Sequence, residues 1–331
     1  MKVREIYYEP AALEYELGKQ LRNKFDDVKW ISIDNHNNIP EMRSKSNSEF
    51  VRMKQNLIVG VRKTHKYVEN HKTSDFLVPY TSSGCSAACL YCYLVCNYNK
   101  CSYLRLFVNR EQMLDKLVKT AEGSDRDLTF EIGSNSDLIL ENTITENLCW
   151  TIPKFAKSRK GYITFPTKFD MVDPLLSLDH GGRTVVRMSV NPEEVIREVE
   201  FGTSPLYNRI KTINVLKDAG YRTGLLIAPV IMVPNWKSLY TDLLDILSDT
   251  LSDKVKEDLN IEVIFMTYSY IHRKINNEAF PNALELYDQE IMTGRGRGKY
   301  CYNQQVHTDG ERFLREEIEK RFGRKSIAYI V

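Results

Sequence analysis

The sequence has no apolar run long enough to span a membrane, and its charged amino-terminal stretch has no apolar core of the kind found in secretion signals. We therefore expect a cytoplasmic protein without a membrane partner. The net charge is only +2, from 46 basic and 44 acidic residues, so nucleic-acid binding requires a local basic patch. The cysteines number seven, an odd count that in the cytoplasm favours reduced thiols or metal ligands over disulfides.

Internal repeats and low-complexity tracts are also absent. The 331 residues, 42% of them hydrophobic, are enough to build a full buried core. Composition and pattern change near residue 76, which predicts three segments. Residues 1–75 form an N-terminal extension, residues 76–290 form the main domain, and residues 291–331 form a C-terminal hairpin and closing helix.

Short apolar runs alternate with helical stretches from residue 76 onward. The predicted strands are 76–81, 104–109, 128–133, 162–167, 184–190, 224–232 and 261–268. Their nearly continuous hydrophobicity is typical of parallel strands buried on both faces. We predict an α/β fold with a partial (β/α)6 barrel of parallel strands, an N-terminal α/β extension, and a C-terminal hairpin and helix. Ligands of such folds bind at the carboxyl ends of the strands.

Three cysteines lie at that end of the first strand, in the stretch "GCSAACLYCYLVC" (84–96). Cys85, Cys89 and Cys92 have the spacing C-x3-C-x2-C. Structural zinc needs four ligands, and no C-x2-C or H-x3-H partner follows. Buried free cysteines are common singly, but three in eight residues are not a usual core pattern. Three thiolates can hold three irons of a [4Fe–4S] cluster and leave the fourth iron open.

The spacing, with the aromatic Tyr91 before the third cysteine, is also the signature of radical S-adenosylmethionine enzymes. The chain also contains the stretches "GCSAACLYCYL", "FEIGSNSD", "ITFPTKFDMVDPLL", "RMSVNPEEVI", "FGTSPLYNRI", "AGYRTGLLIAPV" and "GRGKYCY". Through these stretches it resembles the spore photoproduct lyase family, radical enzymes that repair a thymine dimer in spore DNA. The resemblance runs from about residue 76 to the C-terminus, and more loosely through the N-terminal region.

The resemblance implies two cofactors, a [4Fe–4S] cluster on the three cysteines and S-adenosylmethionine (AdoMet). Ser136 and Lys168 match positions that contact AdoMet, and Ser189 and Asn191 are expected at a strand end facing the same site. Hydroxyl, amide and ammonium groups suit a ligand with a carboxylate, an amine and ribose hydroxyls. Without the resemblance, the serines would be turn or capping residues and Lys168 a solvated charge.

The resemblance also implies the reaction. An electron donor such as ferredoxin or flavodoxin reduces the cluster, AdoMet is cleaved, and a 5′-deoxyadenosyl radical takes a hydrogen atom from C6 of the dihydrothymine half of the lesion. The bridge between the bases then breaks, and the remaining thymine radical needs a hydrogen atom back. Two thymines result.

The residue that returns this hydrogen atom departs from the family pattern. Many lyases of the family carry a cysteine where this chain has Ser134, and a serine O–H bond is too strong for the task. We expect Cys96 to substitute, because a helical turn would place it beside Cys92 and Tyr93, with Cys301 as a second candidate. Tyr91 and Tyr93 match tyrosines thought to relay the atom. The alternative to this donor role is that Cys96 is an ordinary small apolar residue.

DNA binding is expected at the segment "MTGRGRGKYCYN" (292–303), whose glycines and cations suit the tip of a hairpin. Arg295, Arg297, Lys299 and Tyr300 are the candidate contacts with damaged double-stranded DNA, from which the lesion must be extruded. A flexible loop with solvated charges is the alternative. In the closing helix, Thr308 and Glu311 predict a capping box and Gly323 predicts the end.

Two other functions remain open. The first is another radical AdoMet enzyme with a different substrate, which the serine at position 134 favours. The second is a non-enzymatic protein, either an iron–sulfur electron carrier or a zinc-dependent nucleic-acid-binding protein.

Overall fold

The computed structural model describes residues 2–97 and 103–331, without the side chains of residues 96 and 97. The chain divides into two compact units. Unit 1 comprises Met1–Ala88, Leu94–Phe165 and Asp173–Thr184, and unit 2 comprises Cys89–Tyr93, Pro166–Val172 and Val185–Val331. Within the described residues, no helix combines the length and hydrophobicity that crossing a membrane requires.

A five-stranded sheet of order β2-β1-β3-β8-β6 forms the N-terminal part of unit 1. Its strands are β1 (Glu5–Tyr8), β2 (Lys29–Ser32), β3 (Leu57–Gly60), β8 (Leu104–Phe107) and the antiparallel β6 (Ser82–Ser83). The helix α1 (Glu16–Lys24) buries Leu17 and Leu21 against β3 and β8. Two short helices, α2 (Pro40–Arg43) and α3 (Phe50–Met53), precede β3.

The placement of β8 corrects one expectation. We assigned residues 104–109 to the strands of the main domain, but Leu57 pairs with Leu104 and β8 joins the N-terminal sheet. The apolar run correctly signals a buried strand, but hydrophobicity does not specify which sheet the strand enters.

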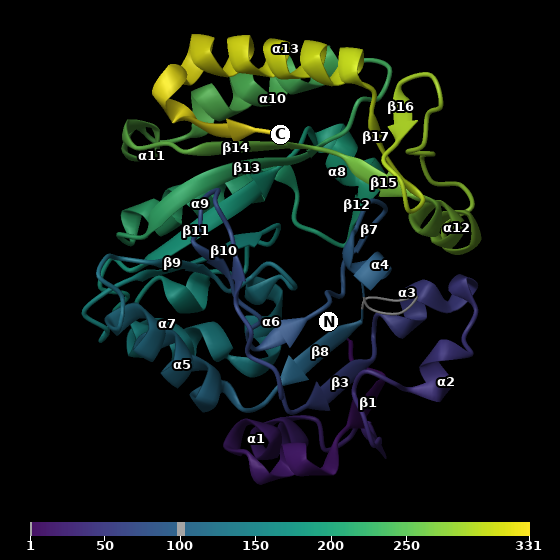
Figure 1. Cartoon of the computed structure of the whole chain (residues 1–331), viewed down its shortest axis with the longest axis vertical. Coiled ribbons are helices and arrows are strands. Elements are labelled where there is room, and N and C mark those ends of the chain that lie inside the picture. Colours follow the sequence, from purple (N-terminus) through teal and green to yellow (C-terminus); the bar gives the residue numbers. More distant parts are fainter. Residues whose placement is uncertain (1, 98–102) are drawn as a thin grey trace. The chain divides into compact units, whose positions relative to one another are not determined.

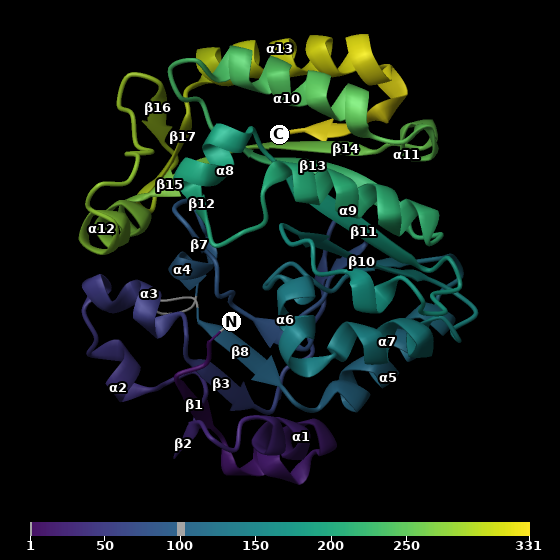
Figure 2. The same ribbon diagram turned by 180° about the vertical axis from the view of Figure 1, so that it is seen from behind.

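The rest of unit 1 contains a second set of strands and three helices. The strands β5 (Phe76–Leu77), β9 (Thr129–Glu131) and β10 (Tyr162–Thr167) run parallel, and β4 (Val68–Glu69) is antiparallel to β5. The helices are α5 (Arg110–Glu122), α6 (Leu138–Thr145) and α7 (Asn147–Phe155), with α5 beside α7 (Figure 2). Only two of the six residues predicted as the strand 76–81 form one.

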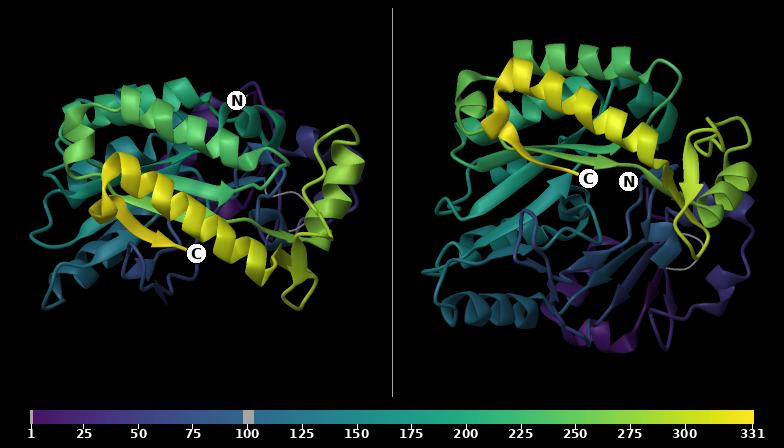
Figure 3. Two further views of the ribbon diagram at one scale, coloured as in Figure 1. Left: turned by 90° about the horizontal axis from the view of Figure 1, so that it is seen from above. Right: turned by 45° about the horizontal axis from the view of Figure 1, so that its top comes forward.

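Unit 2 is built on four parallel strands of order β11-β13-β14-β18. They are β11 (Thr184–Val190), β13 (Arg222–Val230), β14 (Ile261–Phe265) and β18 (Ile327–Ile330). The helices α10 (Trp236–Thr250) and α13 (Gln304–Phe322) lie side by side over β13 and β14 (Figures 1 and 3). The unit also contains α8 (Glu193–Val199), α9 (Leu206–Asp218) and α11 (Asp253–Glu257).

The alternation of side chains along β11 positions the polar residues of unit 2. Met188 and Val190 are fully buried in the core that the helices cover. Successive side chains of a strand point to opposite faces, so Arg187 and Ser189 lie on the other face of the sheet.

The C-terminal segment forms the predicted hairpin and closing helix. The strands β16 (Met292–Gly294) and β17 (Lys299–Tyr302) are antiparallel, and β15 (Thr267–Ser269) pairs with β17. The helix α12 (Tyr270–Ala279) follows β15. The predicted capping box is wrong, because the N-cap of α13 is Asn303, five residues before Thr308, and its side chain accepts a hydrogen bond from the Val306 amide at 3.0 Å. Gly323, with a φ of 77°, ends the helix as predicted.

Candidate active site

The loop that carries Cys85 starts at a tightly held glycine in unit 1. The Gly84 amide donates to the Asn135 carbonyl at 2.8 Å, and the Ser136 hydroxyl donates to the Gly84 carbonyl at 2.8 Å. The Lys54 ammonium donates to the Cys85 carbonyl at 2.8 Å. Ser136, a predicted AdoMet contact, is therefore buried and fixes the backbone beside the first cysteine.

The thiols of this loop fit an iron–sulfur cluster in their chemistry. Cys85, Cys89 and Cys92 form no disulfide and are partly exposed, and the Ala87 amide donates to the Cys85 sulfur at 3.4 Å. Backbone N–H groups aimed at sulfur are typical of cluster cysteines. Across the described positions 2–97 and 103–331, no three His, Cys, Asp or Glu side chains are already gathered for a metal ion. The assignment of these cysteines as ligands therefore depends on their spacing in the sequence.

In unit 2, the backbone of residues 90–92 is held by the end of α8 and by α12. The Leu90 amide donates to the Val199 carbonyl at 3.0 Å, and the Asn276 side-chain amide donates to the Leu90 carbonyl at 2.8 Å. The His272 ring is hydrogen-bonded to the backbone of Cys92. Burial lowers the pKa of His272 to about 4, against the opposing effect of this hydrogen bond. Neither His272 nor Asn276 is predictable from the sequence, since single polar residues on an amphipathic helix give no signal.

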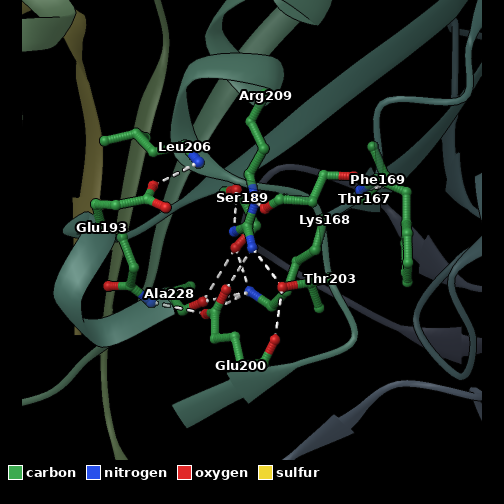
Figure 4. Close-up of polar contacts among 12 residues, drawn as sticks. Thr167, Lys168, Phe169, Ser189, Glu193, Glu200, Thr203, Leu206, Arg209 and Ala228 are labelled. Carbon is green, nitrogen blue, oxygen red and sulfur yellow. Dashed lines mark hydrogen bonds and ion pairs between the residues drawn. The ribbon is translucent and has the colours of Figure 1, made fainter. Parts of the chain in front are cut away.

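Three of the predicted AdoMet contacts meet around one buried carboxylate, that of Glu200. Figure 4 shows two of them, Lys168 and Ser189, near this carboxylate. The Lys168 ammonium lies 3.4 Å from Glu200 Oε1, donates to the Ala228 carbonyl at 2.9 Å and donates to the Ser189 hydroxyl. The Asn191 amide donates to Glu200 Oε1 at 2.9 Å. The structure thus brings Lys168, Ser189 and Asn191 together within unit 2.

Arg209 completes the surroundings of Glu200. Its guanidinium lies 2.7 Å from Glu200 Oε2 and donates to the backbone carbonyl of Ser189 at 3.0 Å. Burial acts to raise the pKa of Glu200, but the charges of Lys168 and Arg209 and the hydrogen bonds from Tyr91 and Asn191 lower it to about 2. The carboxylate is therefore ionised between two cations. Glu200 and Arg209 were also missed, although "FGTSPLYNRI" contains Arg209 and follows Glu200 directly.

Tyr91 connects the cysteine loop to this cluster, because its hydroxyl donates to Glu200 Oε1. Burial and the nearby Glu200 carboxylate raise the pKa of Tyr91 well above its usual value. The phenol therefore keeps its proton, which points at a carboxylate. The second predicted relay residue, Tyr93, is 51% exposed.

The predicted hydrogen-atom donors lie in three places. Cys96 belongs to the short helix α4 (Leu94–Asn97), but its side chain lies outside the described residues. Cys301 is half-buried in β17, opposite Thr267 and Thr293. Ser134 is half-buried in unit 1.

The predicted DNA contacts lie on the hairpin β16–β17. Arg295, Arg297 and Lys299 are exposed, whereas Tyr300 is half-buried with its ring centroid 4.7 Å from that of Tyr287. Arg297 has a φ of 53°, between Gly296 and Gly298, which also have positive φ. The glycines allow this turn, which projects three cations from one tip.

Comparisons with known proteins show the family of the whole chain. The family model for spore photoproduct lyase matches residues 1–331. The spore photoproduct lyase of Bacillus subtilis (strain 168) is 33% identical over 322 residues, covering 95% of this chain and 93% of the relative. That of Clostridium acetobutylicum is 30% identical over 336 residues, covering 99% and 98%.

Solved structures give the same result. A spore photoproduct lyase complexed with dinucleoside spore photoproduct has a TM-score of 0.91 at 27% identity, covering 99% of both chains. A variant with bound AdoMet and dinucleoside spore photoproduct has the same values. This likeness confirms the predicted fold class, an α/β partial barrel of parallel strands. The chain belongs to the spore photoproduct lyase family.

Proposed function

We propose that this chain is a DNA repair lyase that converts the spore photoproduct, 5-thyminyl-5,6-dihydrothymine, to two thymines. The observation that carries the proposal is the match over 99% of the chain to solved lyases, one of which holds AdoMet and the dinucleoside lesion together. The cysteine spacing and the polar cluster around Glu200 support it.

Cys85, Cys89 and Cys92 would hold a [4Fe–4S] cluster, and AdoMet would bind the open iron. When bound, these groups supply the carbon radical that removes a hydrogen atom from the lesion. The protein contributes by holding the groups that bind AdoMet in fixed positions. Lys168 is held by three oxygen acceptors, so its ammonium is presented in one place.

Charge at the cluster around Glu200 suits AdoMet. Two cations, Lys168 and Arg209, surround one carboxylate, which leaves a local charge of +1 for the carboxylate of the ligand. Ser189 and Asn191 add hydroxyl and amide groups, and Ser136 remains a predicted contact of AdoMet.

We assign the return of the hydrogen atom to the thiol of Cys96, through Tyr91 and Tyr93, with Cys301 as the second candidate. A thiol S–H bond is weak enough to give its hydrogen atom to a carbon radical, whereas the O–H bond of Ser134 is not. Once the Cys96 thiol has given up its hydrogen atom, the resulting thiyl radical can take an electron from Tyr91, and the phenol proton can pass to Glu200, to which it is already hydrogen-bonded.

Damaged double-stranded DNA would be held by the hairpin tip. Arg295, Arg297 and Lys299 are exposed and can meet phosphates, and Tyr300 lies in the same strand. The lesion must leave the helix to reach the cofactor. In these terms residues 1–75 are an N-terminal extension, 76–290 the radical AdoMet barrel and 291–331 the DNA-contacting segment. An electron donor such as ferredoxin or flavodoxin acts in the cytoplasm of the spore or germinating cell.

The test is the repair assay with anaerobically purified protein. We expect about four irons per chain, reductive formation of 5′-deoxyadenosine, and recovery of thymine from an oligonucleotide that carries the lesion. Cys85→Ala should abolish both products, and Cys149→Ala, which changes a cysteine outside the motif, should keep them. Formation of 5′-deoxyadenosine without thymine would identify another substrate. Iron without 5′-deoxyadenosine would identify an electron carrier.

A further inference from the structure

The N-terminal sheet of unit 1 has the strand order of a nucleotide-binding sheet. From β1 the chain passes to β2 on one side, and it then crosses to β3 on the other side, so the strand order reverses between β1 and β3. In parallel sheets, ligands bind at the carboxyl ends of the strands at this point of reversal. The cysteine motif and the cluster around Glu200 contribute no residue to this edge.

A pocket of about 300 Å³ lies at this edge, and we call it the switch-point pocket. Its lining includes Glu9 after β1, His36 and Asn37 after β2, Arg62 and Lys63 after β3, and Arg105 and Phe107 of β8. The volume is at the lower end of the range for small-molecule sites. All of these residues belong to unit 1.

One carboxylate in the pocket is already hydrogen-bonded by other groups of the protein. Glu9 is buried and accepts hydrogen bonds from the His36 ring at 2.9 Å, from the His36 amide at 3.1 Å and from the Val61 amide at 2.9 Å. Gly60 allows this arrangement, because a Cβ there would lie 2.9 Å from Glu9 Oε2 and 3.0 Å from His36 Nδ1.

A chain of hydrogen bonds continues from this pair to a buried cation. In the tautomer whose Nδ1–H donates to Glu9, His36 Nε2 accepts from the Asn37 side-chain amide at 3.1 Å, and Asn37 Oδ1 accepts from Arg105 at 3.1 Å. Each group is oriented by the next, so the Arg105 guanidinium has a fixed position in the lining.

A second guanidinium is fixed by different contacts. Arg62 donates to the Tyr80 carbonyl at 2.8 Å and lies 3.7 Å from the centroid of the Phe107 ring. With Lys63 the pocket has three cations against one carboxylate that is already hydrogen-bonded. Preorganised guanidinium groups beside amide and hydroxyl donors are the chemistry that recognises phosphate.

We propose that the switch-point pocket binds a phosphate group, carried either by a free nucleotide or by the DNA backbone. The proposal is independent of the radical reaction, because none of its residues belongs to the cysteine motif or to the cluster around Glu200.

The test is calorimetry on the full, anaerobically reconstituted chain with three probes: inorganic phosphate, thymidine 5′-monophosphate and a short undamaged duplex. Asn37→Asp keeps the acceptor for Arg105 but adds a negative charge, and Asn38→Asp adds the same charge at an exposed neighbour outside the lining. We expect Asn37→Asp to bind the phosphate-bearing probe about tenfold more weakly and Asn38→Asp to bind it as the unaltered chain does. Lys63→Ala should also weaken binding of the phosphate-bearing probe, and its control, Lys66→Ala, should leave that binding unchanged.

The pattern of losses identifies the source of the phosphate. Weaker binding of phosphate and thymidine monophosphate assigns the pocket to a free nucleotide, and weaker binding of the duplex alone assigns it to the DNA backbone. Equal binding of all three probes by Asn37→Asp and Asn38→Asp overturns the proposal, as does the absence of binding by the unaltered chain. Repair activity of the unaltered chain is a separate measurement, so its loss would leave this result standing.

Discussion

A single buried carboxylate, Glu200, organises the candidate AdoMet site. It is the shared partner of Lys168, Arg209, Tyr91 and Asn191. Arg209 is fully buried with it and Lys168 is partly buried, so removal of its charge leaves both cations without their counter-ion.

We expect Glu200→Gln to destabilise unit 2 by about 3–5 kcal/mol, the usual effect of breaking a buried ion pair. AdoMet binding should weaken as well, because Lys168 loses one of its anchors. Urea unfolding and AdoMet titration of the purified chain measure the two effects. The matched control is Glu198→Gln, which removes a carboxylate from an exposed ion pair with Arg197. It should change the free energy of unfolding and the affinity for AdoMet very little. Equal stability of the two variants would contradict this role.

The thiol of Cys96 is the second residue whose role can be tested alone. We expect Cys96→Ala to cleave AdoMet at a normal rate but to give aberrant repair products, because the thymine radical no longer receives its hydrogen atom. Product analysis of a lesion-bearing oligonucleotide measures this, with Cys149→Ala as the control. Normal thymine from Cys96→Ala, together with aberrant products from Cys301→Ala, would move the assignment to Cys301.

At the level of single residues, the sequence pointed to side chains that carry recognisable chemistry. Lys168, Ser189 and Asn191 were found from the family motifs, and the structure joins them around Glu200. Glu200 itself, like His272 and Asn276, acts through partners that are distant in the sequence. A pattern read along the chain cannot reveal such partners, because they are set by packing of separate elements.

The helix α12 supports the cysteine loop, and this gives a prediction for a whole element. Asn276 donates to the Leu90 carbonyl, and its loss leaves a buried acceptor unsatisfied, which typically costs about 1–3 kcal/mol. We expect Asn276→Ala to retain less iron after reconstitution and to lose the cluster faster under a chelator. Asn277→Ala, the exposed neighbour on the same helix, should behave as the unaltered chain does. Equal iron retention in the two variants would show that α12 does not stabilise the loop.

The hairpin β16–β17 should act as a unit in DNA binding. Arg295→Gln and Arg297→Asn each remove one exposed cation, and Asn tolerates the left-handed backbone at position 297. We expect each to weaken binding to undamaged and damaged duplexes alike. The slope of the binding constant against salt concentration, on logarithmic axes, should fall by the amount that about one phosphate contact contributes. Fluorescence anisotropy at several salt concentrations measures both. Lys325→Gln, an exposed cation outside the hairpin, serves as the control, and an unchanged salt slope in the hairpin variants would exclude these contacts.

Elements were predicted more reliably than their ends and partners. The glycines and cations of residues 292–303 correctly predicted a hairpin, since the turn chemistry is local. The start of α13 was misplaced because Asn303 competes with Thr308 as a cap, and tertiary packing of the first turn decides between them. The strand at 104–107 was found, but its sheet depends on pairing with Leu57 and its neighbours, which no local pattern records.

The whole molecule contains two units with separate cores, and each has a buried carboxylate whose pKa is lowered to about 2. In unit 2 it is Glu200, between Lys168 and Arg209. In unit 1 it is Glu9, for which burial acts to raise the pKa but hydrogen bonds from His36 and Val61 lower it. A carboxylate whose pKa is depressed in the folded state stabilises the fold at pH values above 4.5, its ordinary pKa. That stabilisation is lost as the pH falls from 4.5 toward 2.

We therefore expect the free energy of unfolding to fall steeply over this pH range, with Glu200 alone accounting for about 3 kcal/mol. Urea unfolding followed through Trp236 for unit 2, and through Trp30 and Trp150 for unit 1, would separate the two contributions. Glu200→Gln should flatten the pH dependence of the Trp236 signal, and Glu9→Gln that of the other two. A matched exposed substitution, Glu14→Gln, should leave both profiles unchanged. If Glu200→Gln and Glu9→Gln show the same pH dependence as the unaltered chain, the buried carboxylates do not control acid stability, and exposed charges must account for it.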